Sequence, residues 1–205
     1  MTPLPGAVIV ARMIEGCRVE GYAIVSAEGM IANAEGVMPD AIRNNADQRF
    51  LQSELDRAAV IVHGRHSHEG GPRAAHRKRI ILTRQVASLS DDPAHSRSVL
   101  WNPAGATLEA ALSRLSVAEG LMAILGGTEV FDLFLPLYDA FHLTRALHAK
   151  IPAGRPLFSK VGPGKTPEDV LTDAGLKPGP GQDLDDAAAI TLTTWTRAEA
   201  STAAP

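Results

Sequence analysis

Apolar residues along this chain fall into short runs separated by segments of mixed polarity. The runs rich in Val, Ile and Leu are expected to form strands, and they cover residues 19–26, 59–62, 79–82, 98–101, 121–125, 140–146 and 190–196. Helices are expected between them, over 46–58, 107–115, 129–134 and 168–174. This alternation predicts an α/β fold with a mostly parallel central sheet flanked by helices and an antiparallel C-terminal strand.

Two of the expected helices carry further local signals. In 46–58, the spacing places Phe50, Leu51 and Leu55 on one apolar face. The helix at 107–115 begins at Thr107, a good N-cap residue because its hydroxyl can accept a hydrogen bond from a free backbone N–H.

Three segments have no clear period. Residues 27–45 are expected to form a long mobile loop, and a loop of this length in a compact domain is usually functional. Residues 152–185 form a Pro/Gly-rich loop region apart from the helix at 168–174. Residues 1–17 are an N-terminal extension, in which 7–10 is a candidate strand.

The composition is that of one ordinary globular domain. The chain has 205 residues, 45% hydrophobic and 21% charged, which is enough for a full core. A net charge of −3 gives no general attraction to nucleic acid or to a membrane. No signal peptide or membrane-spanning run is found, and the single Cys17 excludes an internal disulfide framework. We therefore expect one cytoplasmic domain over 1–205. A homodimer is compatible with this composition.

Two strand runs end at glycine and continue into polar residues. Gly64 ends the first run, within VIVHGRHSHE, and the Gly126-Gly127 pair ends the second, within MAILGGTEVF. A strand that stops at glycine presents bare backbone N–H groups, and a helix starting there adds its positive end, so the arrangement binds phosphate. Two such steps in one small domain indicate a dinucleotide held across the sheet, with an ordinary strand-to-loop turn as the alternative.

Basic side chains accompany the first glycine step. Arg65 can pair with a phosphate, and Ser67 can cap a helix or donate to a pyrophosphate. Further basic residues gather downstream, at Arg73, Arg77, Lys78, Arg79 and Arg84. Arg84 follows Thr83 at a strand end, a suitable place for a doubly charged phosphate, whereas 77–79 are expected to be half solvated. Nucleic-acid binding is disfavoured, because no basic face or stacking aromatics accompany the cluster.

Four segments in order resemble the dihydrofolate reductase superfamily: VHGRHSHE, RKRIILTR, AILGGTEVFDLFLP and FHLTRA. That superfamily includes the reductase domain of the bifunctional riboflavin-biosynthesis deaminase–reductase. The resemblance covers roughly residues 21 to 160. It implies a dihydrofolate-reductase-like fold and a single NADPH-dependent oxidoreductase domain over 1–205. The stretch SAEGMIA at 26–32 resembles the riboflavin-pathway reductases in particular.

The resemblance also implies a cofactor site. The positions implied to hold NADPH are Gly64, Arg65, His66, Ser67, Thr83, Arg84, Gly126, Gly127, Thr128, Glu129 and Val130. In the family, the residues after the first glycine contact the cofactor phosphates, and those matching Thr83 and Arg84 hold the ribose 2′-phosphate. The Gly126-Gly127 peptide is implied to be strained and to lie under the nicotinamide. The standard GxGxxG fingerprint of dinucleotide-binding domains is absent.

For the substrate, the resemblance implies a carboxylate early in the first helix, after a Met-Pro loop. Met38-Pro39 is present, and Asp47 falls at the matching place before Phe50. Such a carboxylate hydrogen-bonds the 2-amino-pyrimidine edge of a pterin and raises the basicity of the ring. Thr144 matches a threonine that contacts the pterin. The implied substrate is therefore a 2-amino-4-oxo pterin or a related pyrimidine.

Several alternatives stay open. Asp40 or Glu28 is the functional acid if Asp47 is not. Asp40 stands where the family has an aromatic residue, and this difference makes the pocket more polar than a folate site. A polar pocket also suits a specialised dihydropterin such as dihydromethanopterin. The chain is otherwise a riboflavin-pathway ribosylaminopyrimidine reductase, or a non-catalytic nucleotide-binding member of the fold.

A metal site is the remaining hypothesis, and it is disfavoured. The candidate ligands are His63, His66, His68 and Glu69. No HExxH motif occurs, and one cysteine cannot supply the cysteine pair of a deaminase.

Overall fold

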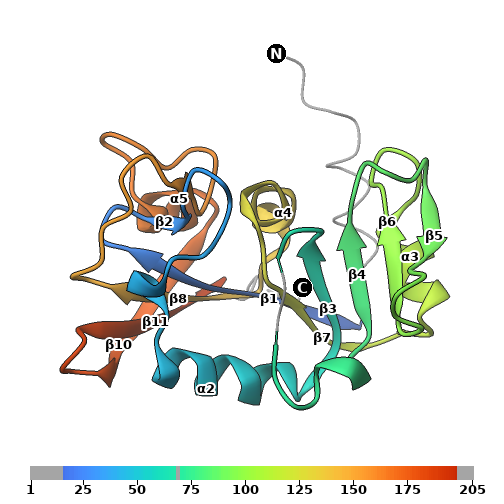
Figure 1. The fold of residues 1–205 in the computed structure, drawn as a ribbon, viewed down its shortest axis with the longest axis horizontal. Helices are drawn as coiled ribbons and strands as arrows, with labels where there is room; N and C mark the ends of the chain where they lie inside the picture. The colour runs from blue at the N-terminus through green and yellow to red at the C-terminus, as the bar shows by residue number, and fades with distance from the viewer. Residues whose placement is uncertain (1–15, 68–69, 198–205) are drawn as a thin grey trace, which may run out of the picture.

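A nine-stranded sheet forms the centre of the computed structural model, which describes residues 16–67 and 70–197 (Figure 1). Its order is β10-β11-β8-β1-β7-β3-β4-β6-β5. The strands are β1 (Cys17–Ser26), β3 (Ala58–Gly64), β4 (Arg79–Leu82), β5 (Leu89–Asp91), β6 (Ser98–Trp101), β7 (Gly120–Ile124), β8 (Ala140–Ala146), β10 (Leu176–Asp185) and β11 (Ile190–Arg197). The strands from β8 to β6 run parallel, whereas β11, β10 and β5 are antiparallel to their neighbours. The predicted α/β architecture is confirmed.

Helices cover both faces of the sheet (Figure 1). They are α2 (Asn45–Leu55), α3 (Leu108–Arg114), α4 (Thr128–Phe134) and α5 (Pro167–Asp173). On the α2 face, Leu55 packs with Tyr22 and Ile61. The other three helices contribute to the larger core on the opposite face, where Val60 and Met122 lie. Because successive side chains of a strand point to opposite faces, strands buried on both sides need unbroken apolar runs.

The start of α2 is held by a side-chain cap. The Asn44 side chain accepts hydrogen bonds from the backbone N–H groups of Ala46 and Asp47, at 2.7 Å and 3.2 Å. This cap fixes where the helix begins and so places Asp47 in its first turn. The predicted cap of α3 is also confirmed, since Thr107 accepts from the backbone N–H of Ala110.

The region 152–185 differs from the expected loop. Strand β10 occupies Leu176–Asp185 and pairs antiparallel with β11. Proline cannot donate to a ladder, but β10 is the outermost strand and pairs on one side only. Its register shifts between Pro178 and Gly181, so the irregular residues fall at a bulge. The loop prediction is therefore wrong over 176–185, and β9 (Arg155–Pro156) adds a shorter strand.

Smaller differences affect three other segments. The expected loop 27–45 contains β2 (Met30–Ala32), which pairs with β9, and the 3-10 turn η1 (Asp40–Ile42). The first helix ends at Leu55 rather than at 58, because Ala58 already belongs to β3. Strand β5 has no counterpart among the predicted runs, because it is short and half polar.

The candidate strand at 7–10 lies outside the described residues. Within the described ranges, no helix is long and apolar enough to cross a membrane.

Candidate functional site

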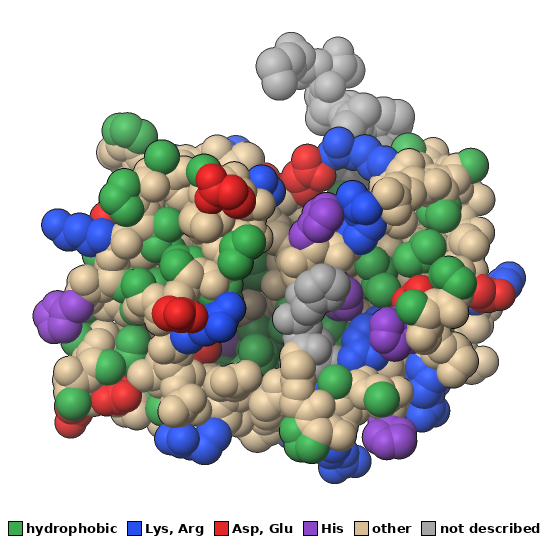
Figure 2. Space-filling view, viewed as in Figure 1, with side chains coloured by type: hydrophobic (Ala, Val, Ile, Leu, Met, Phe, Trp, Pro, Cys, Tyr) green, Lys and Arg blue, Asp and Glu red, His purple; other side chains and the backbone are tan. Residues whose placement is uncertain are grey.

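A large cleft opens where the parallel strands end, and Figure 2 shows it as a recess near the middle of this face. Its volume is about 2220 Å³. A pocket for one drug-sized ligand measures roughly 300–1,000 Å³, so this cleft has room for two ligands side by side. Of the residues predicted to bind cofactor or substrate, all except Gly126 line it. Parallel strands bring their carboxyl ends to one edge, which explains why distant motifs meet there.

The two glycine steps lie side by side in this cleft. The backbone N–H of Gly64, at the end of β3, donates to the carbonyl of Gly126 at 2.7 Å. The Gly126–Gly127 peptide that follows β7 is cis. A Cβ at Gly64 would lie 3.6 Å from the backbone nitrogen of Gly127. The backbone of both steps therefore borders the same space, as a shared phosphate site requires.

Only the first residue of the glycine pair, Gly126, has a backbone conformation that favours glycine. Gly126 has a φ of +88°, which favours glycine, and a Cβ there would overlap the Phe131 ring. Gly127 has a φ of −71° and a ψ of −156°, which other residues adopt, and a Cβ there would meet no atom within 4 Å. The requirement for glycine thus falls on Gly126, whereas Gly127 leaves open space.

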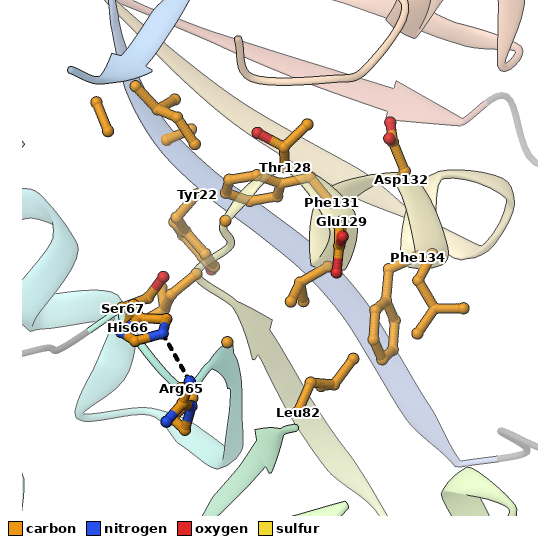
Figure 3. Close-up of a pocket in the computed structure, with 18 of the residues that line it drawn as sticks. Tyr22, Arg65, His66, Ser67, Leu82, Thr128, Glu129, Phe131, Asp132 and Phe134 are labelled. Atoms are coloured by element: carbon orange, nitrogen blue, oxygen red, sulfur yellow. Dashed lines mark hydrogen bonds between the residues drawn. The ribbon is translucent and has the colours of Figure 1, made fainter. Parts of the chain in front are cut away.

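The residues after Gly64 form a turn. The backbone N–H of Ser67 donates to the carbonyl of Gly64 at 2.9 Å, and Arg65 Nη2 lies 3.0 Å from His66 Nε2 (Figure 3). Residues 68–69, which follow Ser67, lie outside the described residues, so both alternatives for Ser67, a helix cap and a pyrophosphate donor, stay predictions. Ser67 lines the cleft.

Arg84 forms an ion pair with Glu129, and both line the cleft. The two side chains come from the end of β4 and the first turn of α4, and Arg84 Nη2 lies 2.6 Å from Glu129 Oε2. Both side chains are 81% exposed. Thr83, next to Arg84, accepts from the backbone N–H of Gln85 and lines the same part of the cleft.

The expectation of half-solvated residues at 77–79 is wrong for the two arginines. Arg77 and Arg79 are both 8% exposed. Arg77 Nη2 lies 2.7 Å from Asp56 Oδ1, and the Arg79 guanidinium donates to the carbonyl of Ala74. Neither lines the cleft. The two arginines therefore bind the Asp56 carboxylate and the Ala74 carbonyl instead of solvent. These contacts depend on the tertiary structure.

Asp47 faces Thr144 at the other end of the cleft. Burial raises the pKa of the Asp47 carboxyl, because removal from water disfavours its charged form. The Thr144 hydroxyl, on β8, opposes this rise by hydrogen-bonding the carboxylate. Phe50, one helical turn after Asp47, lines the same region. The three predicted substrate residues are therefore brought together.

The two alternative acids lie elsewhere. The Asp40 side chain is 93% exposed and pairs with Arg43 at 3.2 Å. Glu28 is exposed and accepts from the Ser26 hydroxyl at 2.8 Å, which is the main reason that its pKa is lowered. Neither lines the cleft. Of the three candidate acids, Asp47 alone borders the space where a substrate would bind.

The candidate metal ligands do not form a cluster among the described residues. His68 and Glu69 lie outside the described residues. His63 Nδ1 lies 2.9 Å from the carbonyl oxygen of Gly64, and His66 borders Arg65. Within the part of the chain that the structure describes, no three His, Cys, Asp or Glu side chains gather as a metal site.

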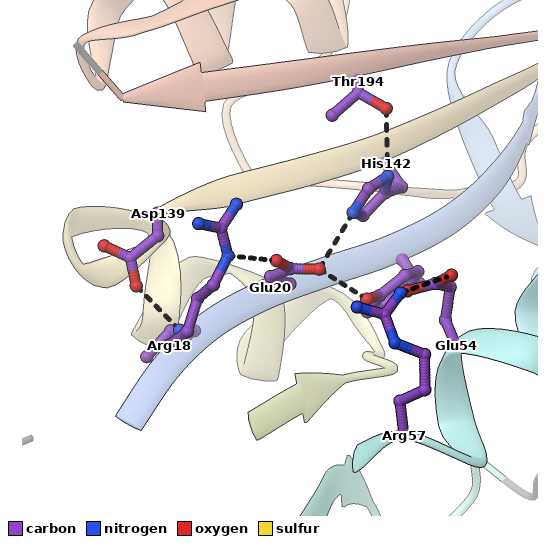
Figure 4. A network of polar contacts seen from close by, with 9 residues as sticks. Arg18, Glu20, Glu54, Arg57, Asp139, His142 and Thr194 are labelled. Carbon is purple, nitrogen blue, oxygen red and sulfur yellow. Dashed lines mark hydrogen bonds and ion pairs between the residues drawn. The ribbon is translucent and has the colours of Figure 1, made fainter. Parts of the chain in front are cut away.

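A buried polar network below the substrate end was missed by sequence reasoning (Figure 4). The hydroxyl of Tyr22 donates to Glu20 at 2.6 Å, and Glu20 lies 3.0 Å from His142 Nε2. Arg18 also pairs with Glu20, and Thr194 lies 3.1 Å from His142 Nδ1. The His142 ring stacks on Tyr22 with centroids 4.6 Å apart. A glutamate inside an apolar strand run was the signal that could have revealed the network.

Hydrogen bonding determines the charge state of Glu20. Burial favours the neutral carboxyl, but hydrogen bonds from His142, Tyr22 and Arg18 outweigh it and lower the pKa of Glu20 from 4.5 to about 2. Glu20 is therefore a buried carboxylate at neutral pH. Tyr22, whose own pKa is raised by burial and by Glu20, stays a donor to it.

We expect Glu20→Gln to remove a pH-dependent part of the stability. A lowered carboxyl pKa stabilises the fold above the unfolded value, and this contribution disappears as the pH falls through the folded value. The lowering from 4.5 to about 2 corresponds to a loss on the order of 3 kcal/mol at neutral pH. Urea unfolding of both proteins across a pH series should show their stabilities converging between 4.5 and 2. Exposed Glu35→Gln is the control, and a pH-independent difference for Glu20→Gln would contradict the assignment.

Comparison with known proteins identifies the fold. A scan of family models and a search of curated proteins found no match. Among solved structures, a dihydrofolate reductase from Enterococcus faecalis complexed with NADP(H) and RAB-propyl is similar, with a TM-score of 0.60 and 17% identity over 88% of this chain and 96% of that one. A putative riboflavin biosynthesis protein from Shewanella sp. PV-4 has a TM-score of 0.60 and 18% identity, over 88% and 99%.

A third similar structure is a larger protein. It is the diaminohydroxyphosphoribosylaminopyrimidine deaminase/5-amino-6-(5-phosphoribosylamino)uracil reductase from Thermotoga maritima, with a TM-score of 0.61 and 15% identity. The match covers 90% of this chain but 57% of that protein, so this chain spans little more than half its length. At these identities the likeness shows the fold alone. This chain has the dihydrofolate-reductase-like fold implied by its four sequence segments.

Proposed function

We propose that this chain is an NADPH-dependent reductase of a 2-amino-4-oxo pterin, either dihydrofolate-like or a specialised dihydropterin such as dihydromethanopterin. The observation that carries the proposal is one continuous cleft with two chemically different ends. A carboxyl with a raised pKa faces a hydroxyl at one end, at Asp47 and Thr144. The two glycine steps meet at the other end, beside Arg84.

The residues at the second end fit a nicotinamide dinucleotide. A Cβ at Gly127 would meet no atom, so the backbone there leaves a free cradle for a bound group. Arg65 and Ser67 would bind the pyrophosphate, and Thr83 with Arg84 would bind a ribose 2′-phosphate. When bound, NADPH supplies the hydride for the reduction.

Asp47 carries the protein's part of the proton chemistry in this proposal. Its carboxylate accepts hydrogen bonds from the 2-amino-pyrimidine edge of the substrate and favours a proton on the ring nitrogen. Thr144 favours the ionised form of this carboxylate and so opposes the effect of burial on its pKa. Phe50 presents an apolar ring beside the same space, which excludes water and strengthens the electrostatic contact.

A second candidate is reduction of the ribosylamino side chain of a riboflavin precursor. It is supported by the stretch Ser26 to Ala32 and by the likeness to the T. maritima deaminase/reductase. The two chemistries differ in what receives the hydride: a ring C=N bond in the first, a sugar carbon in the second. A non-catalytic, nucleotide-binding protein is the remaining candidate.

A substrate panel tests these candidates. NADPH consumption is measured with dihydrofolate, other dihydropterins and a ribosylaminopyrimidine phosphate, each with its product identified. We expect turnover with a dihydropterin and its loss in Asp47→Asn. Turnover with the ribosylaminopyrimidine alone would establish the second candidate, and NADPH binding without turnover of any compound would favour the non-catalytic one.

We expect Arg84→Ala to weaken NADPH binding while leaving NADH nearly unchanged. Only NADPH offers a 2′-phosphate to the guanidinium, and loss of a charge-assisted contact costs roughly 1.5–3 kcal/mol, which is about ten- to a hundredfold in affinity. Calorimetric titration with both cofactors measures the two affinities. Arg43→Ala, at the substrate end of the cleft, is the control. Equal losses for NADPH and NADH would rule out the 2′-phosphate assignment.

A further inference from the structure

The ion pair between Arg84 and Glu129 lies where the proposed cofactor site needs a free cation. It joins the segment that follows β4 to the first turn of α4. Figure 3 shows Glu129 extending from α4 toward the side on which Leu82 ends β4. Both side chains line the cleft.

The pair adds little to the stability of the fold. Both side chains are 81% exposed, and exposed ion pairs are weak because water screens them and two long side chains must be ordered. No other carboxylate of the described residues pairs with Arg84. Asp132 and Glu109 also line the cleft, but neither forms an ion pair with Arg84. Asp132 accepts from the backbone N–H of Ser159, and Glu109 lies in the first turn of α3.

The chemistry of the two partners suggests what the pair does. The Arg84 guanidinium donates to the carboxylate through Nη2, so a 2′-phosphate that takes the bidentate fork of the same guanidinium has to displace or share that contact. A 2′-phosphate would also bring two negative charges next to the Glu129 carboxylate. A cofactor without that phosphate can bind with the ion pair intact, and a carboxylate can accept hydrogen bonds from its ribose hydroxyls.

We propose that Glu129 is a specificity-determining residue that competes with the 2′-phosphate of NADPH for Arg84. This inference rests on the proposed nicotinamide site. It gives Glu129 a role opposite to that of a simple phosphate-contacting residue: the carboxylate lowers the preference for NADPH over NADH. The free energy of NADPH binding then includes the cost of weakening the ion pair and of placing the phosphate beside the carboxylate, whereas that of NADH binding does not.

The test measures binding of the oxidised cofactors, which separates it from turnover. Calorimetric titrations with NADP⁺ and NAD⁺ are run on the wild-type chain, Glu129→Gln, Arg84→Ala and the double variant. We expect Glu129→Gln to strengthen NADP⁺ binding by roughly three- to fivefold and to leave NAD⁺ unchanged or weaker. The gain for NADP⁺ should shrink in the Arg84→Ala background, because the competition needs the guanidinium.

A matched control removes the same charge elsewhere in the cleft. Glu109→Gln neutralises a cleft-lining carboxylate on α3 and should leave the NADP⁺/NAD⁺ affinity ratio unchanged. Equal gains for both cofactors, or an equal NADP⁺ gain with and without Arg84, would overturn the competition. If the wild-type chain binds NADP⁺ and Glu129→Gln changes nothing, the inference fails and the proposed site survives. Absence of binding of either cofactor to the wild-type chain overturns both.

Discussion

Asp47→Asn is expected to lower turnover by roughly 10²–10⁴ while leaving NADPH affinity unchanged. An amide fills the same space, but it cannot accept both N–H bonds of the substrate edge or hold the negative charge that favours a protonated ring. Partial recovery at low pH is expected, since bulk protons can then protonate the substrate before it binds. Steady-state kinetics across a pH series measures both effects.

The stability of Asp47→Asn gives an independent check. Burial raises the pKa of Asp47, so its ionised form costs folding free energy at neutral pH. The amide removes that cost, and the variant should unfold at the same or a higher temperature than the wild type. A loss of activity accompanied by a lower melting temperature would point to a structural role instead.

The alternative acids supply the controls for this prediction. Asp40→Asn should be mild, because the Asp40 side chain is 93% exposed and lies outside the cleft. Glu28→Gln should also have a small effect on turnover, because Glu28 lies outside the cleft. A large loss at Asp40 with none at Asp47 would reverse the assignment, and activity unaffected by either change would favour the sugar-reducing chemistry.

Gly127→Ala is expected to weaken NADPH binding by roughly a hundredfold or more without destabilising the fold. A Cβ at Gly127 meets no protein atom and its φ of −71° is compatible with alanine, so the apo protein accepts the methyl group. Gly127 lines the cleft, and the added methyl group would occupy space that the cofactor needs. Calorimetric titration measures the affinity, and thermal unfolding measures the stability.

Gly126→Ala is the matched comparison, and we expect it to destabilise the fold, which Gly127→Ala leaves intact. At this position φ is +88° and a Cβ would overlap the Phe131 ring, so the fold itself should be destabilised. Near-native NADPH affinity in Gly127→Ala would show that the cofactor backbone does not approach this residue, and the close-approach argument would be wrong.

The local structure of this protein follows from its sequence because local structure depends on neighbours along the chain. Strands at 79–82, 98–101 and 140–146 have the bounds predicted from their apolar runs. Thr107 caps α3 as its side chain requires. Even the adjacency of Gly64 and Gly126 could be anticipated, because parallel strands deliver their carboxyl ends to one edge.

The features that the sequence did not determine depend on which strands become neighbours and in which register. Pairing of Tyr22 with His142, and of His142 with Thr194, places one polar row next to Glu20 and gives that carboxylate its partners. The edge position of β10 makes a strand out of a Pro/Gly-rich segment.

The charge pairings of the site have the same origin. Arg84 and Glu129 are 45 residues apart in sequence, and Asp47 is 97 residues from Thr144. A side chain's own type and spacing limit what it can bind, and those limits are readable from the sequence. Its partner, its burial and hence its pKa are set by residues brought to it from other elements, and these only the tertiary structure decides.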